Sequence, residues 1–135
     1  MPTLSVVIIR TALVYFLLGL TVGSWLLMFK GTGWIPGIWR LLPAHIEWML
    51  FGWTFQLIMG VAFWMFPRMA TGPKRGNEAL VVAAYLTLNL GVWLVVLSDV
   101  YFFNPLVSFS GRLLELTSVV FFVLHLFPRV KPFGA

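Results

Sequence analysis

Four long apolar stretches dominate the pattern of this chain, and short segments with glycine, proline and charged residues separate them. The stretches cover about residues 4–29, 43–66, 78–102 and 110–127. Because a helix rises about 1.5 Å per residue, roughly 20 apolar residues cross the hydrocarbon core of a bilayer. None of the stretches alternates apolar and polar residues, and a helix satisfies its own backbone groups in lipid. The pattern predicts an all-α membrane protein, in which residues 1–135 form one domain, a four-helix transmembrane bundle.

The ends of the stretches carry start and stop signals. Asn77 is a predicted N-cap of the third span, and Ser108 or Ser110 can cap the fourth. The tripeptide Phe-Pro-Arg closes the second span at 66–68 and the fourth at 127–129. A proline followed by a basic residue is an ordinary end of a span, but the repetition also suits a chain of two related helical hairpins.

Small and polar residues inside the spans indicate close helix packing. Gly19 and Gly23 are four residues apart, a spacing that lets another helix approach closely. That helix is either a neighbouring span of the same chain or one from a second copy. Asn89, in the middle of the third span, is expected to form a hydrogen bond with a neighbouring helix or a water molecule.

The composition favours lipid as the solvent of this chain. The chain is 61% hydrophobic and 10% charged, whereas soluble domains are about 45–50% apolar and about 25% charged. It contains no cysteine, which excludes disulfides and thiolate metal sites. The net charge of +5 does not indicate a nucleic-acid partner, because the basic residues lie between apolar spans, where membrane topology requires them.

The distribution of basic residues predicts the orientation. One side of the membrane would carry Arg10, Arg68, Lys74, Arg75, Arg129 and Lys131, and the other Lys30, Arg40 and Arg112. Cytoplasmic loops carry an excess of lysine and arginine. We therefore expect a multi-pass protein of a bacterial inner membrane, with both termini and the loop 69–77 in the cytoplasm.

This orientation gathers titratable side chains toward the outer half of the membrane. They are His45, Glu47, Asp99, Arg112 and Glu115, with Arg40 close by. Ionisable groups are costly in a membrane and are candidates for function. A second interpretation is interfacial capping and ion pairing, because Arg112 and Glu115 are i,i+3 neighbours on one helix.

A stripe of residues begins at His45. At about 100° per residue, His45, Met49, Gly52 and Gln56 share one helix face with Phe63. Gly52 on this face and Gly60 beside it leave room for a flat macrocycle such as haem, whose iron needs a neutral imidazole nitrogen. A face of small residues for helix packing explains the glycines equally well.

The run 43–68 starts with His45 and Glu47, carries a Gly52-Trp53 pair and ends in Phe-Pro-Arg. It resembles the second transmembrane helix of haem-copper oxidase subunit I, closest to the branch of cbb3-type cytochrome oxidases and nitric oxide reductases. The resemblance implies that His45 is an axial ligand of a low-spin haem b in respiratory electron transfer. It also implies that this chain corresponds to an N-terminal four-helix fragment, without the later helices that carry the family's other ligands. We therefore expect no complete oxidase or reductase activity from this chain alone.

The second ligand of such a haem stays open. The other histidine, His125, is near the inner end of the fourth span, whereas His45 is at the outer end of the second. Its offset in depth from His45 approaches about 20 Å, so the two cannot share one iron. The haem could be five-coordinate, use Met49 or a partner's ligand, or be shared by His45 of both chains in a homodimer.

Two functions without haem are also open. The chain could be a non-catalytic subunit or assembly factor of a larger respiratory complex, without a cofactor of its own. It could instead be a small oligomeric transporter or channel, with the outer titratable residues and Asn89 along its path.

Overall fold

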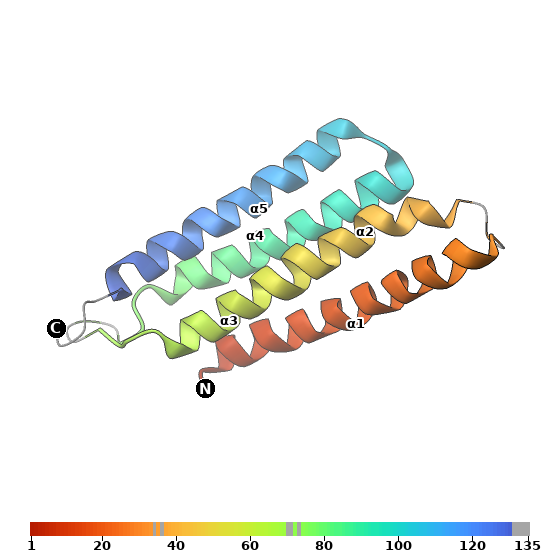
Figure 1. The fold of residues 1–135 in the computed structure, drawn as a ribbon. Coiled ribbons are helices and arrows are strands. Elements are labelled where there is room, and N and C mark those ends of the chain that lie inside the picture. The colour runs from red at the N-terminus through yellow and green to blue at the C-terminus, as the bar shows by residue number, and fades with distance from the viewer. Residues whose placement is uncertain (34, 36, 70–71, 73, 131–135) are drawn as a thin grey trace.

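The chain forms four long helical segments joined by short loops (Figure 1). This computed structural model describes residues 1–33, 35, 37–69, 72 and 74–130. The first segment is α1, Thr3–Thr32. The third is α4, Glu78–Leu97, which continues as a π-helical turn over Ser98–Phe102. The fourth is α5, Pro105–Leu126, which ends in a 3₁₀ turn, Phe127–Arg129.

The second segment, Ile38–Met65, is the least regular. Its parts are a 3₁₀ turn at Ile38–Leu41, α2 at Leu42–Glu47, a π-helical stretch at Trp48–Phe55 and α3 at Gln56–Met65. A π-helix closes its hydrogen bonds over five residues instead of four and is therefore wider than an α-helix. Helix α3 stops because Pro67 favours an extended conformation at the residue before it, and Phe66 has φ −62° and ψ 147°.

The four predicted spans are confirmed as helices long and apolar enough to cross a membrane. The predicted cap of the third span is also confirmed, since the Asn77 side chain accepts a hydrogen bond from Ala79 N at 3.1 Å. The predicted start of the fourth span was wrong. Helix α5 begins at Pro105 because Asn104 caps it by accepting from Leu106 N at 3.0 Å. Ser110 lies within the helix and donates to the Val107 carbonyl.

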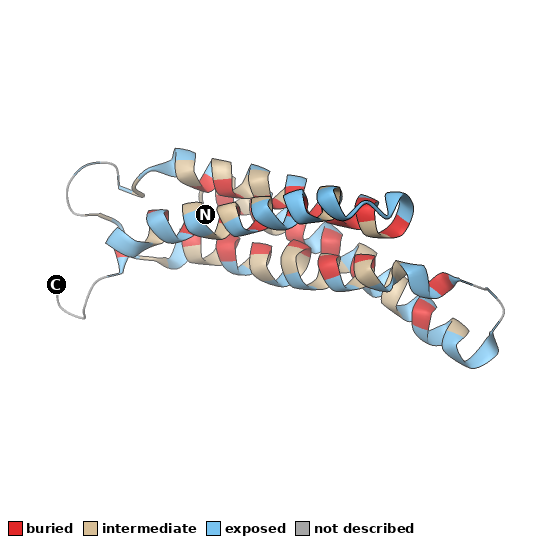
Figure 2. Cartoon of the chain, turned by 90° about the horizontal axis from the view of Figure 1, so that it is seen from above, coloured by how far each residue is buried: buried red, intermediate tan, exposed pale blue. Residues whose placement is uncertain are grey.

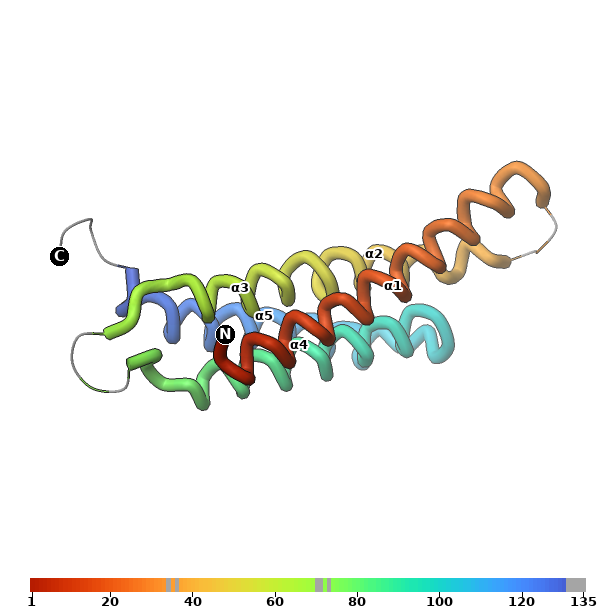
Figure 3. The backbone as a smooth tube through the Cα atoms, turned by 90° about the horizontal axis from the view of Figure 1, so that it is seen from below, coloured from red at the N-terminus to blue at the C-terminus, as the bar shows by residue number. Residues whose placement is uncertain are grey.

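The helices form two hairpins, and the start of α1 and the end of α5 lie at the end of the bundle that carries the II–III loop, which joins α3 to α4 (Figure 1). Helix α1 packs along the second segment, and α4 packs along α5. At the opposite end, the first hairpin projects beyond the turn that joins α4 to α5 (Figure 3). The I–II loop, which joins α1 to the second segment, is therefore separated from the compact part of the bundle. Any site formed by all four helices lies further back along the bundle.

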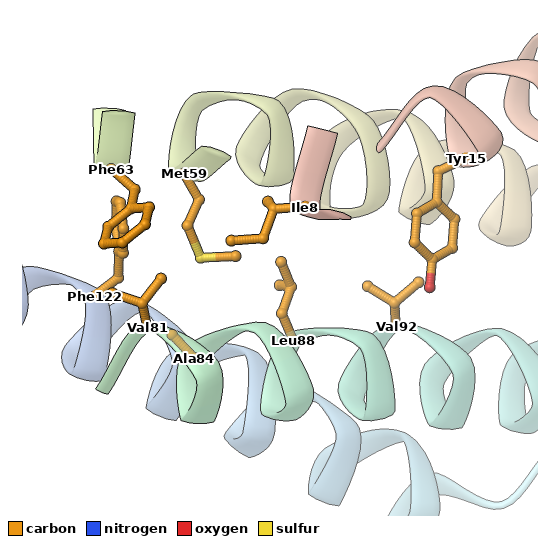
Figure 4. Packing of buried hydrophobic residues seen from close by; sticks show 9 residues of the cluster. All are labelled: Ile8, Tyr15, Met59, Phe63, Val81, Ala84, Leu88, Val92 and Phe122. Carbon is orange, nitrogen blue, oxygen red and sulfur yellow. The ribbon is translucent and has the colours of Figure 1, made fainter. Parts of the chain in front are cut away.

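Apolar side chains form the centre of the bundle and also cover its outside. The central cluster contains Ile8 and Tyr15 from α1, Met59 and Phe63 from α3, Val81, Ala84, Leu88 and Val92 from α4, and Phe122 from α5 (Figure 4). Buried residues line the inner sides of the helices, and exposed ones the outer sides (Figure 2). The outer face includes Leu17, Leu27 and Leu106, whose exposed fractions are 67%, 72% and 77%. Such a surface suits lipid rather than water.

The glycine pair of α1 receives the second segment of the same chain. A β-carbon at Gly19 would lie 2.6 Å from the Met49 sulfur, and one at Gly23 would lie 2.8 Å from His45 Nδ1. Both distances are shorter than a real contact of this kind. Of the two predicted partners for these glycines, the structure shows the neighbouring span.

Candidate functional site

His45 lies against α1 rather than in an open pocket. Its Nδ1 donates a hydrogen bond to the Gly19 carbonyl at 2.8 Å, and its ring fills the notch at Gly23. A carbonyl can only accept, so this bond places the hydrogen of the imidazole on Nδ1. The side chain is half-buried and borders a groove of about 300 Å³, which Ser24, Trp39 and Leu42 also line.

The remaining residues of the predicted stripe also contact their own bundle. Met49 packs into the notch at Gly19, and Tyr15 occupies the space beside Gly52. A β-carbon at Gly52 would lie 2.5 Å from the Tyr15 ring. Gln56 is fully buried, and its Nε2 donates to the Ile8 carbonyl at 3.3 Å.

Side chains of the same chain fill the space along this stripe. The room that Gly52 was expected to leave for a macrocycle contains Tyr15, and the space at Gly60 contains Ile8 and Ile9. The small residues of this face therefore serve helix packing, which was the alternative interpretation of the stripe. Among the described residues, no three His, Cys, Asp or Glu side chains gather in a way that could hold a metal ion.

The π-helical stretch changes which neighbours the stripe meets. In this wider helix Thr54 Oγ1 donates to the Met49 carbonyl, five residues earlier, at 2.8 Å. The predicted stripe assumed the α-helical turn of about 100° per residue, and the π-helical stretch does not keep this angle. The predicted alignment of His45 with Gln56 is therefore approximate. His45 and Met49 contact α1, whereas Gln56 contacts both α1 and α4.

A chain of polar side chains connects α1, α3 and α4 in the middle of the bundle. Tyr15 donates its hydroxyl hydrogen to Asn89 Oδ1 at 2.9 Å, and Asn89 Nδ2 donates to Gln56 Oε1 at 2.9 Å. The predicted hydrogen bond of Asn89 with neighbouring helices is confirmed. These polar groups satisfy one another between helices.

His125 lies at the end of the bundle away from the I–II loop. Its Nδ1 donates to the Asn77 carbonyl at 2.9 Å, and its Nε2 accepts from Arg129 Nη1 at 3.0 Å. Both ring nitrogens are engaged, and the residue is 2% exposed. The position agrees with the predicted separation of His125 from His45 and gives this histidine a role in fixing the II–III loop.

Three of the predicted outer residues meet inside the bundle. Arg112 Nη1 donates to Glu47 Oε2 at 2.6 Å and to Glu115 Oε2 at 3.2 Å. The Glu47 side chain is 2% exposed and that of Glu115 is 3% exposed, whereas the Arg112 side chain is 46% exposed. The predicted pair of Arg112 and Glu115 is confirmed. The sequence did not show that Glu47, 65 residues from Arg112, completes a triad.

Arg40 and Asp99, which also belong to the predicted outer group, do not join this triad. Arg40 Nη2 donates to the Val100 carbonyl at 3.2 Å, and its guanidinium carbon lies 4.9 Å from the centre of the Phe103 ring. Asp99 lines a separate shallow cavity of about 430 Å³, together with Asn104 and polar serines. The outer residues thus form separate local arrangements instead of one site.

A groove of about 680 Å³ lies between the projecting end of the first hairpin and the end of the third segment. Trp25, Phe29 and Leu41 line it, and Arg40 is the one charged residue among the described lining side chains. Its apolar walls suit a lipid-facing surface.

Comparisons of the chain with protein-family models, with curated proteins and with solved structures give no match.

Proposed function

We propose that this chain is a non-catalytic membrane subunit of a larger respiratory complex and has no cofactor of its own. The observation that carries the proposal is that side chains of α1 fill the space along the stripe of His45, Met49, Gly52 and Gln56. Tyr15 occupies the space at Gly52, and Ile8 and Ile9 occupy the space at Gly60. A bundle whose interior is closed by its own side chains is suited to lateral packing in a membrane.

The respiratory assignment has separate support. It comes from the resemblance of residues 43–68 to the second helix of haem-copper oxidase subunit I. A retained helix with a closed ligand face is consistent with a subunit that shares a fold element with an oxidase and lacks its chemistry.

The proposed setting is the bacterial inner membrane with both termini in the cytoplasm. Its support is the excess of basic residues at one end of the bundle, including Arg68, Lys74 and Arg75. The start of α1, the end of α5 and the II–III loop lie at one end (Figure 1). Lys131, which belongs to the same predicted group, lies outside the described residues.

The proposal is tested by purifying the tagged chain from its native membranes in mild detergent. We expect larger oxidase or reductase subunits to copurify, and the isolated chain to show no Soret absorption band. His45→Gln is the matched variant, because glutamine keeps an N–H donor for the Gly19 carbonyl and cannot bind iron. This variant should leave the absorption spectrum of the complex unchanged.

Two results would contradict the proposal. A Soret band of the isolated chain that disappears in His45→Gln would establish haem binding as the function. Purification without any redox subunit would remove the respiratory assignment, even if the chain were colourless.

A further inference from the structure

The triad of Glu47, Arg112 and Glu115 contains two carboxylates, although one is enough to balance the positive charge of Arg112. One guanidinium nitrogen, Arg112 Nη1, contacts an oxygen of each carboxylate. With both carboxylates ionised, the three side chains would carry a net charge of −1 inside helices that are long enough to span a membrane. A buried ion pair needs only one carboxylate for each arginine.

The second oxygen of each carboxylate indicates independently that a hydrogen-bond donor is missing from the triad. Glu47 Oε1 and Glu115 Oε1 are buried and, among the described residues, have no hydrogen-bond partner. Both side chains are more than nine-tenths buried. An ionised carboxylate accepts hydrogen bonds only, so neither acid can satisfy the other while both are charged. Buried polar atoms without partners are uncommon and costly.

The helix packing makes room for the second carboxylate. A β-carbon at Gly91 would lie 2.9 Å from Cγ of Glu115, so α4 carries a glycine where Glu115 passes it. The Arg112 guanidinium carbon, in turn, lies 5.9 Å from the centre of the Phe51 ring. Glu115 is therefore a buried residue whose side chain packs against α4.

The charges around Glu115 favour one proton. The other charged side chains of the triad are Glu47 from the second segment and Arg112 from the same helix as Glu115. Neighbouring carboxylates in a poorly hydrated environment resist double ionisation. A single proton cancels the excess negative charge, and it also turns one carboxyl group into a donor for a carboxylate oxygen.

We propose that Glu47 and Glu115 together form a proton-binding site that holds one exchangeable proton at neutral pH, beside a charged Arg112. The proton comes from water and returns to water, so no other reactant takes part. The site lies between the second segment and α5, and it therefore joins the two hairpins. It is independent of the proposed respiratory function.

Infrared spectroscopy of the chain in nanodiscs of zwitterionic phospholipid tests this site. The chain has only four acidic side chains, so the C=O band of a protonated carboxylic acid can be assigned by substitution. At neutral pH we expect such a band, with a shift in heavy water. It should be lost in Glu47→Gln and also in Glu115→Gln, because the one remaining carboxylate can pair with Arg112. Glu78→Gln is the matched control, since Glu78 is exposed at the start of α4, and this variant should keep the band.

Thermal unfolding gives a second measurement. Glutamine resembles a protonated carboxyl group, so each single variant should unfold within a few degrees of the parent chain. The double variant should unfold at a clearly lower temperature, because Arg112 then has no anion.

The absence of an acid band at neutral pH overturns the proposal, as does a band that survives both single variants. Equal loss of stability in each single variant would show two ordinary ion pairs. A sodium-dependent rise in the unfolding temperature that Glu115→Gln abolishes would show a metal cation in place of the proton.

Discussion

At the scale of single residues, Arg129 shows how this chain closes one end of its bundle. Its side chain is enclosed, with 1% of the residue exposed. Nη2 donates to the Phe66 carbonyl at 2.8 Å and to the Phe63 carbonyl at 3.2 Å, and Nε donates to the Pro67 carbonyl at 3.2 Å. The last carbonyls of a helix have no partner within it. The arginine of the second Phe-Pro-Arg therefore caps the helix that ends in the first.

Replacing this arginine with methionine should destabilise the protein. Arg129→Met keeps an apolar stem of similar length and leaves buried carbonyls without a donor. We expect the free energy of unfolding to fall by about 2–4 kcal/mol. Denaturant unfolding in detergent, followed by circular dichroism, measures this change.

The equivalent arginine of the first Phe-Pro-Arg is the control. Arg68 is exposed, and Arg68→Met should change the free energy of unfolding by no more than about 0.5 kcal/mol. An equal loss in both variants would mean that general charge, and not the capping of α3, accounts for the effect.

At the scale of helices, the sequence predicted what depends on local pattern. The apolar lengths predicted four helices, Asn77 predicted a cap, and the i,i+3 spacing predicted the pair of Arg112 and Glu115. The π-helical stretch Trp48–Phe55 was not predictable, because its residues have the same apolar character as an α-helical span. The contact of Glu47 with Arg112 was not predictable either, because it depends on how the second segment packs against α5. The same packing places Tyr15 beside Gly52, where the sequence left haem and helix packing both open.

The crossing of α4 and α5 depends on a second pair of glycines. A β-carbon at Gly91 would lie 2.8 Å from the Gly111 carbonyl oxygen, and one at Gly111 would lie 2.9 Å from the Gly91 carbonyl oxygen. Backbone atoms cannot rotate away as a side chain can. Gly91→Ala should therefore separate the helices and lower the free energy of unfolding by about 1–3 kcal/mol.

Gly31→Ala provides the comparison for this prediction. Gly31 also lies in a helix, α1, but a β-carbon there would meet no atom within 4 Å. Alanine should raise stability at this position, by up to about 1 kcal/mol. If both substitutions changed stability in the same direction, the close approach of Gly91 and Gly111 would not be what holds α4 and α5 together.

At the scale of the whole molecule, the two ends of the bundle differ in charge and shape. The end with the II–III loop carries Arg68, Lys74 and Arg75, whereas Lys30 and Arg40 belong to the other end. At that other end the first hairpin projects beyond the rest of the bundle (Figure 3). Basic residues are retained on the cytoplasmic side during insertion. The excess at the first end should therefore keep it inside, whereas the projecting hairpin should extend beyond the outer face.

Cysteine labelling in intact bacterial cells measures this orientation without background, because the chain contains no cysteine. Tyr101, at the end of the third segment, is 67% exposed, and Ala79, at the start of α4, is exposed at the other end. Tyr101→Cys should react with a membrane-impermeant maleimide in intact cells, and Ala79→Cys should react only after the membrane is opened. The reverse pattern would place both termini outside, and labelling of both variants in intact cells would show insertion in two directions. Either result would mean that the basic residues near the II–III loop do not determine how this bundle inserts.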